Sequence, residues 1–391
     1  LLAILLLLHA PRVHAQEEFI NPPSRLLAKV PFEQLTGGII ILHAKIGTYD
    51  DTLNFILDTG SSGISLDSTT VEILGLKPVP TDKTIRGVAG IHKVRFLYNQ
   101  TLHFPTITVD SLNFHINDYS VLTAVYGERV DGIIGYAMLS RYIMKLDYDS
   151  MKLSFCTRGT IRYPRGGYML RPTINFLPTQ TLRVRDSYSF NTRMLYDMGA
   201  GLCMLFSRDC AEDSDFIDRR KKRWIKEGEG LGGKIDMELF VLKELKLGPY
   251  KFKNIPSYIF DDANNVTDYP NTCGLLGNDI LRRFNVIMNY DRQEFHLTPN
   301  SHYNEPFDYS YSGLELYYIE GRILAGDVAK GSPAEAAGIK EGDEIIAVNK
   351  NFNLNLNQYK IALQAAGEKV KIILRRDGVM QEIEFKVKSI L

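Results

Sequence analysis

The chain has 391 residues, of which 45% are hydrophobic and 24% charged, and its 46 Lys and Arg residues balance its 46 Asp and Glu residues. This length suffices for two or three domains with cores of their own. A net charge of zero gives no support to a nucleic-acid partner. The basic run at 219–223 lies among acidic residues that offset it, so we interpret it as a solvated helical face.

The first 15 residues predict a secretory signal peptide. They form an apolar stretch that is shorter than the roughly 20 residues needed to span a bilayer. Val13 and Ala15 are small residues at the spacing that signal peptidase reads, which predicts cleavage before Gln16. We therefore expect an exported protein, periplasmic or extracellular, with an uncleaved N-terminal membrane anchor as the alternative.

The four cysteines show no spacing typical of a metal site. Export would permit any of their three possible pairings, and Cys203, inside the apolar run "GLCMLF", is at least as consistent with a buried free thiol. The cysteines are Cys156, Cys203, Cys210 and Cys273.

Two short segments share one pattern. Residues 55–63 read "FILDTGSSG" and residues 194–202 read "MLYDMGAGL", each an apolar run followed by an Asp and a bend of small residues. One such Asp alone is typical of a turn or a helix N-cap. The two, Asp58 and Asp197, are separated by 197 − 58 = 139 residues, which indicates an internal repeat.

Downstream landmarks extend the repeat. "DGIIGYAMLSRYIMKLDYDSMKLSF" (131–155) and "CGLLGNDILRRFNVIMNYDRQEFHL" (273–297) carry the same features in the same order, and Gly132 and Gly274 are 142 residues apart. Most of the intervening segments are short β-rich runs broken by turn residues. The sequence therefore predicts two similar β lobes. We place these lobes at residues 16–160 and 161–300.

Each lobe also carries a glycine-rich tip between alternating segments, which predicts a β-hairpin. The second tip lies in "GEGLGG" (228–233), which satisfies the dinucleotide-binding pattern G-x-G-x-x-G. That pattern must follow a strand and open a helix, whereas an alternating "KIDMELF" follows here, so a hairpin is favoured. The two tips are Gly87, Val88, Ala89 and Gly90 in the first lobe, and Gly230, Leu231, Gly232 and Gly233 in the second.

The composition changes after Glu305. Residues 306–391 have the length and turn punctuation of a separate small domain. The segment "GSPAEAAGIKEGDEIIAVN" (331–349) predicts a short helix, a turn and a strand. We therefore predict a third domain at 306–391.

The repeated Asp residues suggest a reaction. On equivalent loops of duplicated lobes, Asp58 and Asp197 would meet at an approximate two-fold axis. Two carboxyls about 3 Å apart do not both ionise easily, so they share one proton. One can then act as general base on a water molecule while the other protonates a carbonyl oxygen. This pairing suits amide hydrolysis with no cofactor and no metal, and peptide hydrolysis is our hypothesis.

These motifs resemble those of the aspartic peptidases, and the compact lobes are more similar to the retropepsin-like branch, here with two lobes fused in one chain. "DTGSSG" with "DGIIG", and "DMGAG" with "CGLLG", carry the resemblance. It implies a mainly β acid-protease fold, a peptide or protein substrate, and lobes that act as a monomer. Asp58 and Asp197 would be catalytic, and the two glycine-rich tips would be flaps. The supporting residues would be Thr59, Gly60, Ser61, Met198 and Gly199, with Ile133, Ile134, Leu275 and Leu276 packed beneath the loops.

The sequence departs from the family pattern at two positions. Met198 stands where the family has Thr or Ser, so half of a hydroxyl brace between the loops is lost, at about 0.5–1.5 kcal/mol per missing bond. We expect a looser dyad that is still assembled. Ser61 in the first loop is matched by Ala200 in the second. A hydroxyl donated to a carboxylate favours its charged form, so we predict that Asp58 is the more readily ionised member.

The third domain resembles PDZ domains of bacterial exported proteases. The resemblance implies that "SGLELYYI" provides the carboxylate-binding loop and groove strand, with Gly313, Leu314 and Leu316 nearest a bound peptide terminus. A peptide would add there as a strand. A PDZ fold that only packs against the lobes is the alternative.

We therefore predict an exported aspartic endopeptidase with a C-terminal PDZ domain for peptide recognition or regulation. The alternative is a catalytically weak or inactive pseudoprotease that acts as a peptide-binding scaffold, because Met198 and Ala200 depart from the pattern. Serine-hydrolase and zinc-peptidase chemistry lack support, since the sequence has neither a G-x-S-x-G nor an H-E-x-x-H motif.

Overall fold

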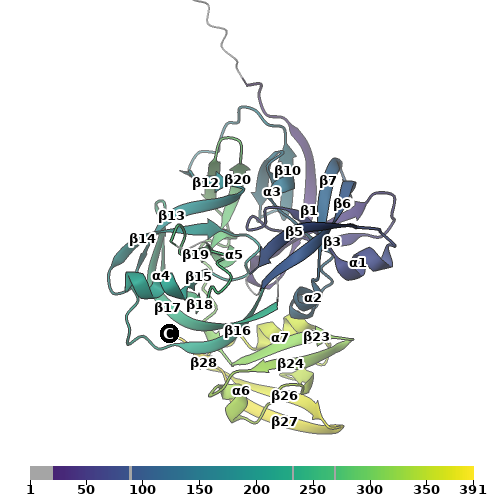
Figure 1. The fold of residues 1–391 in the computed structure, drawn as a ribbon. Helices are drawn as coiled ribbons and strands as arrows, with labels where there is room; N and C mark the ends of the chain where they lie inside the picture. The colour runs from purple at the N-terminus through teal and green to yellow at the C-terminus, as the bar shows by residue number, and fades with distance from the viewer. Residues whose placement is uncertain (1–20, 88–89, 231–232, 268–269) are drawn as a thin grey trace, which may run out of the picture.

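The computed structural model describes residues 21–87, 90–230, 233–267 and 270–391 (Figure 1). The predicted signal peptide and the tip residues Val88, Ala89, Leu231 and Gly232 lie outside the described residues. Within the described ranges, none of the helices has both the length and the apolar character that a membrane span requires.

The first lobe is built almost entirely of strands. Its short helices cap strand ends, as at Asp67, whose carboxylate accepts the backbone N–H of Thr70 at the start of α1. The elements are β1 (Leu26–Gln34), η1 (Thr36–Gly38), β2 (Ile40–Ile46), β3 (Leu53–Leu57), β4 (Ile64–Asp67), α1 (Ser68–Ile73), β5 (Val79–Gly87), β6 (Gly90–Phe104), β7 (Ile107–Asn117), α2 (Ser120–Tyr126), β8 (Gly132–Ile134), α3 (Tyr136–Leu139), β9 (Ile143–Asp147) and β10 (Lys152–Cys156).

The second lobe repeats this order, which confirms the internal repeat. From β13 onward each element has a counterpart in the first lobe, except that no helix there corresponds to α2 among the residues described. The elements are β11 (Tyr168–Leu170), β12 (Thr173–Asn175), β13 (Leu177–Arg185), β14 (Ser189–Tyr196), β15 (Met204–Ser207), α4 (Arg208–Ser214), β16 (Trp224–Gly230), β17 (Gly233–Leu247), β18 (Tyr250–Phe260), β19 (Gly274–Leu276), α5 (Asn278–Leu281), β20 (Phe284–Asn289) and β21 (Glu294–Pro299).

In each lobe a three-residue strand crosses beneath an Asp loop. β8 runs parallel to β3 and antiparallel to β4, and β19 is placed in the same way between β14 and β15. Strands with neighbours on both sides and both faces covered read as continuous apolar runs, which explains "FIL" and "MLY" before the Asp residues. The crossing strands fix the start of each loop, because Ile134 and Leu276 accept the backbone N–H of Asp58 and Asp197, respectively, at 3.0 Å.

The two lobes share one sheet. Its central strands follow the order β1-β10-β9-β20-β21-β11, three from each lobe. The antiparallel pair β9 and β20 joins the lobes, with Met144 opposite Met288 and Leu146 opposite Val286. Since both lobes contribute to one sheet and one hydrophobic core, the Asp loops are held on a common base.

The strands and helices after residue 309 form the third domain, at the lower end of the molecule in Figure 1, whereas Phe307 still packs against the core of the lobes. A five-stranded sheet in the order β23-β24-β25-β26-β27 encloses a core that is separate from that of the lobes. The elements are β22 (Ser310–Tyr311), β23 (Leu314–Ile319), β24 (Arg322–Val328), α6 (Pro333–Ala336), β25 (Glu344–Val348), α7 (Leu356–Ala362), β26 (Lys369–Arg376), β27 (Val379–Lys386) and β28 (Lys388–Ser389).

The basic run at 219–223 and the four cysteines were the subject of predictions from the sequence. The basic run at 219–223 is not a helical face: it lies in a turn and an irregular segment, where Arg219 pairs with Asp215, and Lys221 with Asp186, so local ion pairs replace the expected helix. Among the four cysteines, Cys210 and Cys273 form a disulfide. Cys203 is a buried free thiol, as is Cys156.

Candidate active site

The two Asp loops meet at the interface between the lobes. Each carboxyl lies against the glycine of the opposite loop: a Cβ added to Gly60 would lie 2.6 Å from Cγ of Asp197, and one added to Gly199 would overlap the carboxyl of Asp58. Only glycine leaves room for this approach. The structure thus brings together the two predicted catalytic residues, although they are 139 positions apart in the sequence.

Backbone donors hold the two carboxylates in a nearly symmetric way. Gly60 N–H donates to Asp58 Oδ1 at 2.7 Å, and Gly199 N–H donates to Asp197 Oδ1 at 2.8 Å. A second backbone donor serves each carboxyl, from Ser61 and Ala200 respectively. Ser61 donates its backbone N–H, and Ala200 donates its backbone N–H in the same way. The hydroxyl that Ser61 has and Ala200 lacks therefore makes no difference to how the two carboxyls are bonded.

Burial raises the pKa of both carboxyls. Each keeps some surface open to the cleft, but protein surrounds it on the other sides. The pKa of Asp58 is raised well above its ordinary value of 3.8 by burial, by the charge of Asp197 and by the hydrogen bond to Asp197. Burial also raises the pKa of Asp197, and the hydrogen bond from Asp58 partly offsets this rise. Both pKa values are therefore raised, which means that the pair holds a proton between its two carboxyls, and the order in which Asp58 and Asp197 ionise stays a prediction.

The predicted half-brace is present. The hydroxyl of Thr59, which is fully buried, donates to the carbonyl of Tyr196 at 2.6 Å and accepts the backbone N–H of Met198 at 2.9 Å. One threonine thus contacts both sides of the opposite loop. The Met198 side chain is fully buried in the core of the lobes. It fills apolar space in place of the second hydroxyl, and the dyad is assembled.

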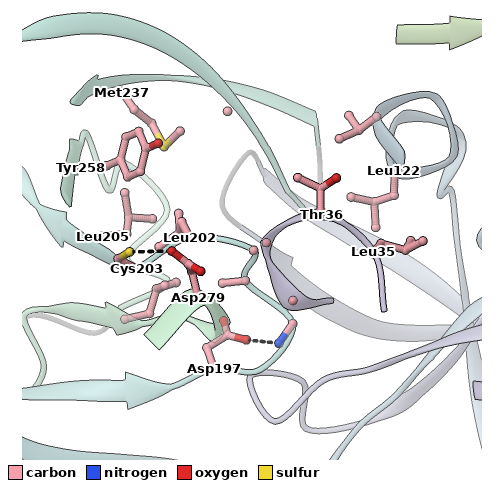
Figure 2. A pocket seen from close by; sticks show the side chains of 18 of the residues that line it. Leu35, Thr36, Leu122, Asp197, Leu202, Cys203, Leu205, Met237, Tyr258 and Asp279 are labelled. Carbon is pink, nitrogen blue, oxygen red and sulfur yellow. Dashed lines mark hydrogen bonds between the residues drawn. The ribbon is translucent and has the colours of Figure 1, made fainter. Parts of the chain in front are cut away.

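A large cleft of about 1440 Å³ contains the dyad and extends between the lobes. Apolar side chains line it on both sides of the dyad, among polar and charged residues. In Figure 2, Leu35 and Leu122 lie on the first-lobe side of the cleft, and Leu205, Met237 and Tyr258 on the second-lobe side, with Asp197 near the base.

The apolar walls follow the sequence repeat. Ile56 and Leu195 each precede one Asp of the pair by two residues, and both line the cleft. Ile133 and Leu275 line it too, whereas Ile134 and Leu276 are fully buried beneath the loops. The four residues of the crossing strands, which we predicted to pack beneath the loops, are all buried, and Ile133 and Leu275 also line the cleft because side chains alternate between the two faces of a strand.

Both predicted hairpins form. Gly87 pairs with Gly90 at the end of β5 and β6, and Gly230 pairs with Gly233 at the end of β16 and β17. The stems of both hairpins line the cleft, as at Arg86 in the first lobe. The segment 228–233 therefore belongs to a hairpin and not to a dinucleotide site.

Sequence reasoning missed a polar group near Asp58. Ser65 and Tyr119 share a 2.6 Å hydrogen bond, and the charge of Asp58 contributes to raising the pKa of the Tyr119 hydroxyl, after burial as the main cause. His115 is also buried at the cleft, and burial lowers its pKa to about 4, so the imidazole is neutral near pH 7. These residues lie in β4, in β7 and just after β7, where no motif indicated them.

The cleft also reaches the third domain. Gly313, Leu314 and Leu316 line its far part, together with residues of α7 such as Lys360. Gly313 has a φ of +70°, and a Cβ there would overlap Ser332, so this position requires glycine. Leu314 and Leu316 point their side chains into the domain core. The predicted peptide-binding loop thus opens toward the same cleft as the dyad.

Within the described ranges, no cluster of three or more His, Cys, Asp or Glu residues could hold a metal ion.

Two family profiles match the chain. The aspartyl protease profile matches residues 43–138 and again 182–280, one match in each lobe. The PDZ domain profile matches residues 325–376. Each aspartyl protease match contains one of the two Asp loops, so the comparisons agree with the duplicated architecture.

Two curated proteins of Bacillus subtilis (strain 168) are similar to part of the chain. The carboxy-terminal processing protease CtpB is 30% identical over 91 residues, which cover 22% of this chain and 19% of that protein. The carboxy-terminal processing protease CtpA is 38% identical over 82 residues, which cover 20% of this chain and 18% of that protein. The chain therefore spans about a fifth of these relatives, a stretch too short to include both Asp loops.

Proposed function

We propose that this chain, in which two aspartyl protease lobes precede a PDZ domain, is an aspartic endopeptidase that hydrolyses peptide bonds with a water molecule activated between Asp58 and Asp197. One observation carries the proposal: each carboxyl lies against the glycine of the opposite loop, at the base of a cleft that both lobes line. The two profile matches to the aspartyl protease family support a peptide hydrolase in general.

The two carboxyls would have different roles. The ionised carboxylate of Asp197 takes a proton from water, whose oxygen attacks the amide carbon, while Asp58 gives its proton to the carbonyl oxygen. The resulting gem-diol collapses as Asp197 passes its new proton to the amide nitrogen, a gem-diol hydroxyl returns a proton to Asp58, and the C–N bond breaks. The products are a carboxylic acid and an amine, and the dyad ends with one shared proton, as it began.

The cleft suggests a substrate with apolar side chains on both sides of the cleaved bond. Ile56 and Ile133 line one side, and Leu195 and Leu275 the other, at equivalent positions of the repeat. Burying one such side chain in full contributes about 1.5–3 kcal/mol. We propose that the PDZ domain binds a peptide as an added strand at β23, which is an edge strand of its sheet. Helix α2 of the first lobe packs against β23, so the PDZ groove lies at the interface with the lobes.

Export is part of the proposal. The apolar residues 1–15 support a signal peptide, and the disulfide between Cys210 and Cys273 is typical of proteins in an oxidising compartment. We propose a periplasmic or extracellular location for the mature chain, with membrane anchoring by an uncleaved signal as the alternative.

A scaffold that binds peptides without cleaving them is the second candidate, and Met198 in place of a bracing hydroxyl is the observation in its favour. Incubating the purified chain with a mixed peptide library from pH 3 to 8 separates the two. The double variant Asp58→Asn/Asp197→Asn is the control. Cleavage by the wild type and not by the double variant supports the endopeptidase. Peptide binding without cleavage at any pH, by a folded wild type, supports the scaffold.

A further inference from the structure

The hairpin of the second lobe is attached to the PDZ domain along its first strand. Four successive residues of β16 each contact the third domain, three through their side chains and Ile225 through its backbone carbonyl. The Trp224 and Tyr311 rings lie 6.3 Å apart, Tyr311 OH donates to the carbonyl of Ile225 at 2.9 Å, Lys226 Nζ lies 3.2 Å from Glu315 Oε1, and Tyr317 OH donates to Glu227 Oε1 at 2.7 Å.

Tyr317 is the centre of this attachment. Its side chain is nearly fully buried, and its ring lies flat on Gly326, where any Cβ would overlap it. Lys234, on the second strand of the hairpin, lies 4.6 Å above the ring and 2.6 Å from Glu227 Oε1. Tyr317 therefore contacts both strands of the hairpin through a hydrogen bond and a cation–π contact.

The face of the hairpin opposite Glu227 and Lys234 forms part of the cleft, and Lys226 lies on this cleft face. Gly228 pairs with Ile235, and Lys226 pairs with Met237, so strand alternation places Ile235 and Met237 on the other face from Glu227 and Lys234. Both apolar side chains line the cleft. A shift of the hairpin relative to β23 would therefore move two residues of the substrate-binding wall.

The first-lobe hairpin is held in another way. Arg86 Nη1, near its tip, donates to the carbonyl of Asn265 in the second lobe at 3.1 Å. This contact joins lobe to lobe, whereas the contacts of β16 join a lobe to the PDZ domain. The two hairpins, although equivalent in the repeat, thus have different supports.

We propose that Tyr317 and Glu315 of the PDZ strand β23 are positioning residues for the second-lobe hairpin, so that the PDZ domain completes the substrate cleft. This inference rests on the proposed function for its effect on cleavage. The attachment itself does not depend on catalysis. A peptide bound at β23 would pair with the same strand that holds the hairpin. Along this strand, Glu315 and Tyr317 alternate with the core residues Leu314 and Leu316.

The test compares Tyr317→Phe with the matched control Tyr318→Phe. The first removes the hydroxyl that bonds Glu227 and keeps the ring on Gly326, so the fold is retained. The second removes a hydroxyl from the next residue of β23, whose side chain is 36% exposed. Hydrogen exchange of residues 224–230 and 234–239 reports on the hairpin, and Trp224, the only tryptophan of the chain, reports on its stem by fluorescence quenching.

We expect Tyr317→Phe to accelerate exchange in the hairpin about fivefold, the factor for loss of one hydrogen bond, with no change in exchange of the dyad loops. For a peptide that is cleaved, KM rises severalfold and kcat changes little, because the dyad is untouched. Unchanged hairpin exchange and quenching in Tyr317→Phe would overturn the inference, even if the chain cleaves peptides. Faster exchange in a chain that cleaves no peptide would uphold the attachment and reject the proposed function alone.

Discussion

Replacing Thr59 with Val removes a buried hydroxyl that braces the two Asp loops, while it keeps the shape of the side chain. The wild-type hydroxyl makes two bonds, of 2.6 and 2.9 Å, to backbone groups of Tyr196 and Met198. Thr59 is fully buried, so water does not replace the lost bonds. An unpaired buried group costs about 1–3 kcal/mol. We therefore expect the free energy of unfolding to fall by about 2–5 kcal/mol, a large part of the roughly 5–15 kcal/mol of a typical domain.

Urea unfolding, followed by circular dichroism and by Trp224 fluorescence, measures this change. The control is Thr272→Val, because the Thr272 hydroxyl is buried and has no partner among the described residues. That substitution should leave the free energy of unfolding unchanged or raise it. A loss of less than about 0.5 kcal/mol in Thr59→Val would refute the view that this threonine braces the loops. Cleavage should fall with stability, since the dyad depends on the register of the two loops.

Three further predictions concern the dyad and its support. The raised pKa values mean that the folded chain binds a proton more tightly than the unfolded chain, whose Asp residues have the ordinary pKa of 3.8. The stabilisation of the fold by this proton is complete below about pH 3.8 and is lost as the pH rises through the raised pKa values. Asp58→Asn should flatten this pH dependence of the free energy of unfolding, as measured by unfolding experiments at several pH values. Gly199→Ala should abolish peptide cleavage, because its Cβ would overlap Asp58, whereas Gly201→Ala, whose nearest neighbouring atom would be 3.3 Å away, should keep most activity in the same assay. Reducing the bond between Cys210 and Cys273, which are 63 residues apart, should lower the free energy of unfolding by about 4 kcal/mol on the chain-entropy estimate, and a shift in urea midpoint much smaller than this would reject that estimate.

Much of the fold could be predicted because the duplicated lobes repeat their landmarks at nearly constant spacing. The Asp loops, the crossing strands and the hairpins depend on short-range patterns: apolar runs, glycines and alternation. Pairing Asp58 with Asp197 required only that equivalent loops meet at a pseudo-two-fold axis. The turns and the short helix predicted a small third domain, and its PDZ identity was predicted from the resemblance of residues 331–349 to that family. These features are local, and local patterns are what a single sequence displays.

The remaining features depend on contacts between distant segments. The order of ionisation within the dyad was predicted from the hydroxyl of Ser61, whereas the backbone N–H of Ser61 bonds Asp58, and the backbone N–H of Ala200 bonds Asp197 in the same way. The cleft-facing position of Ile133 and Leu275 in the three-residue crossing strands was missed, since so short a run shows no periodicity. The attachment of β16 to β23 joins residues about 90 positions apart, as in the bond from Tyr317 to Glu227. No motif in either segment indicates the other.

The measurement that tests the central claim most directly is kcat/KM for one peptide that the wild type cleaves, compared between the wild type, Asp58→Asn and Asp197→Asn at several acidic pH values. If the two carboxyls share a proton and activate water together, each substitution alone should reduce kcat/KM by at least about a thousandfold, and the double variant should be no worse than either single variant. If either single variant keeps most of the wild-type activity, cleavage does not depend on the dyad, and the assignment of the active site is wrong.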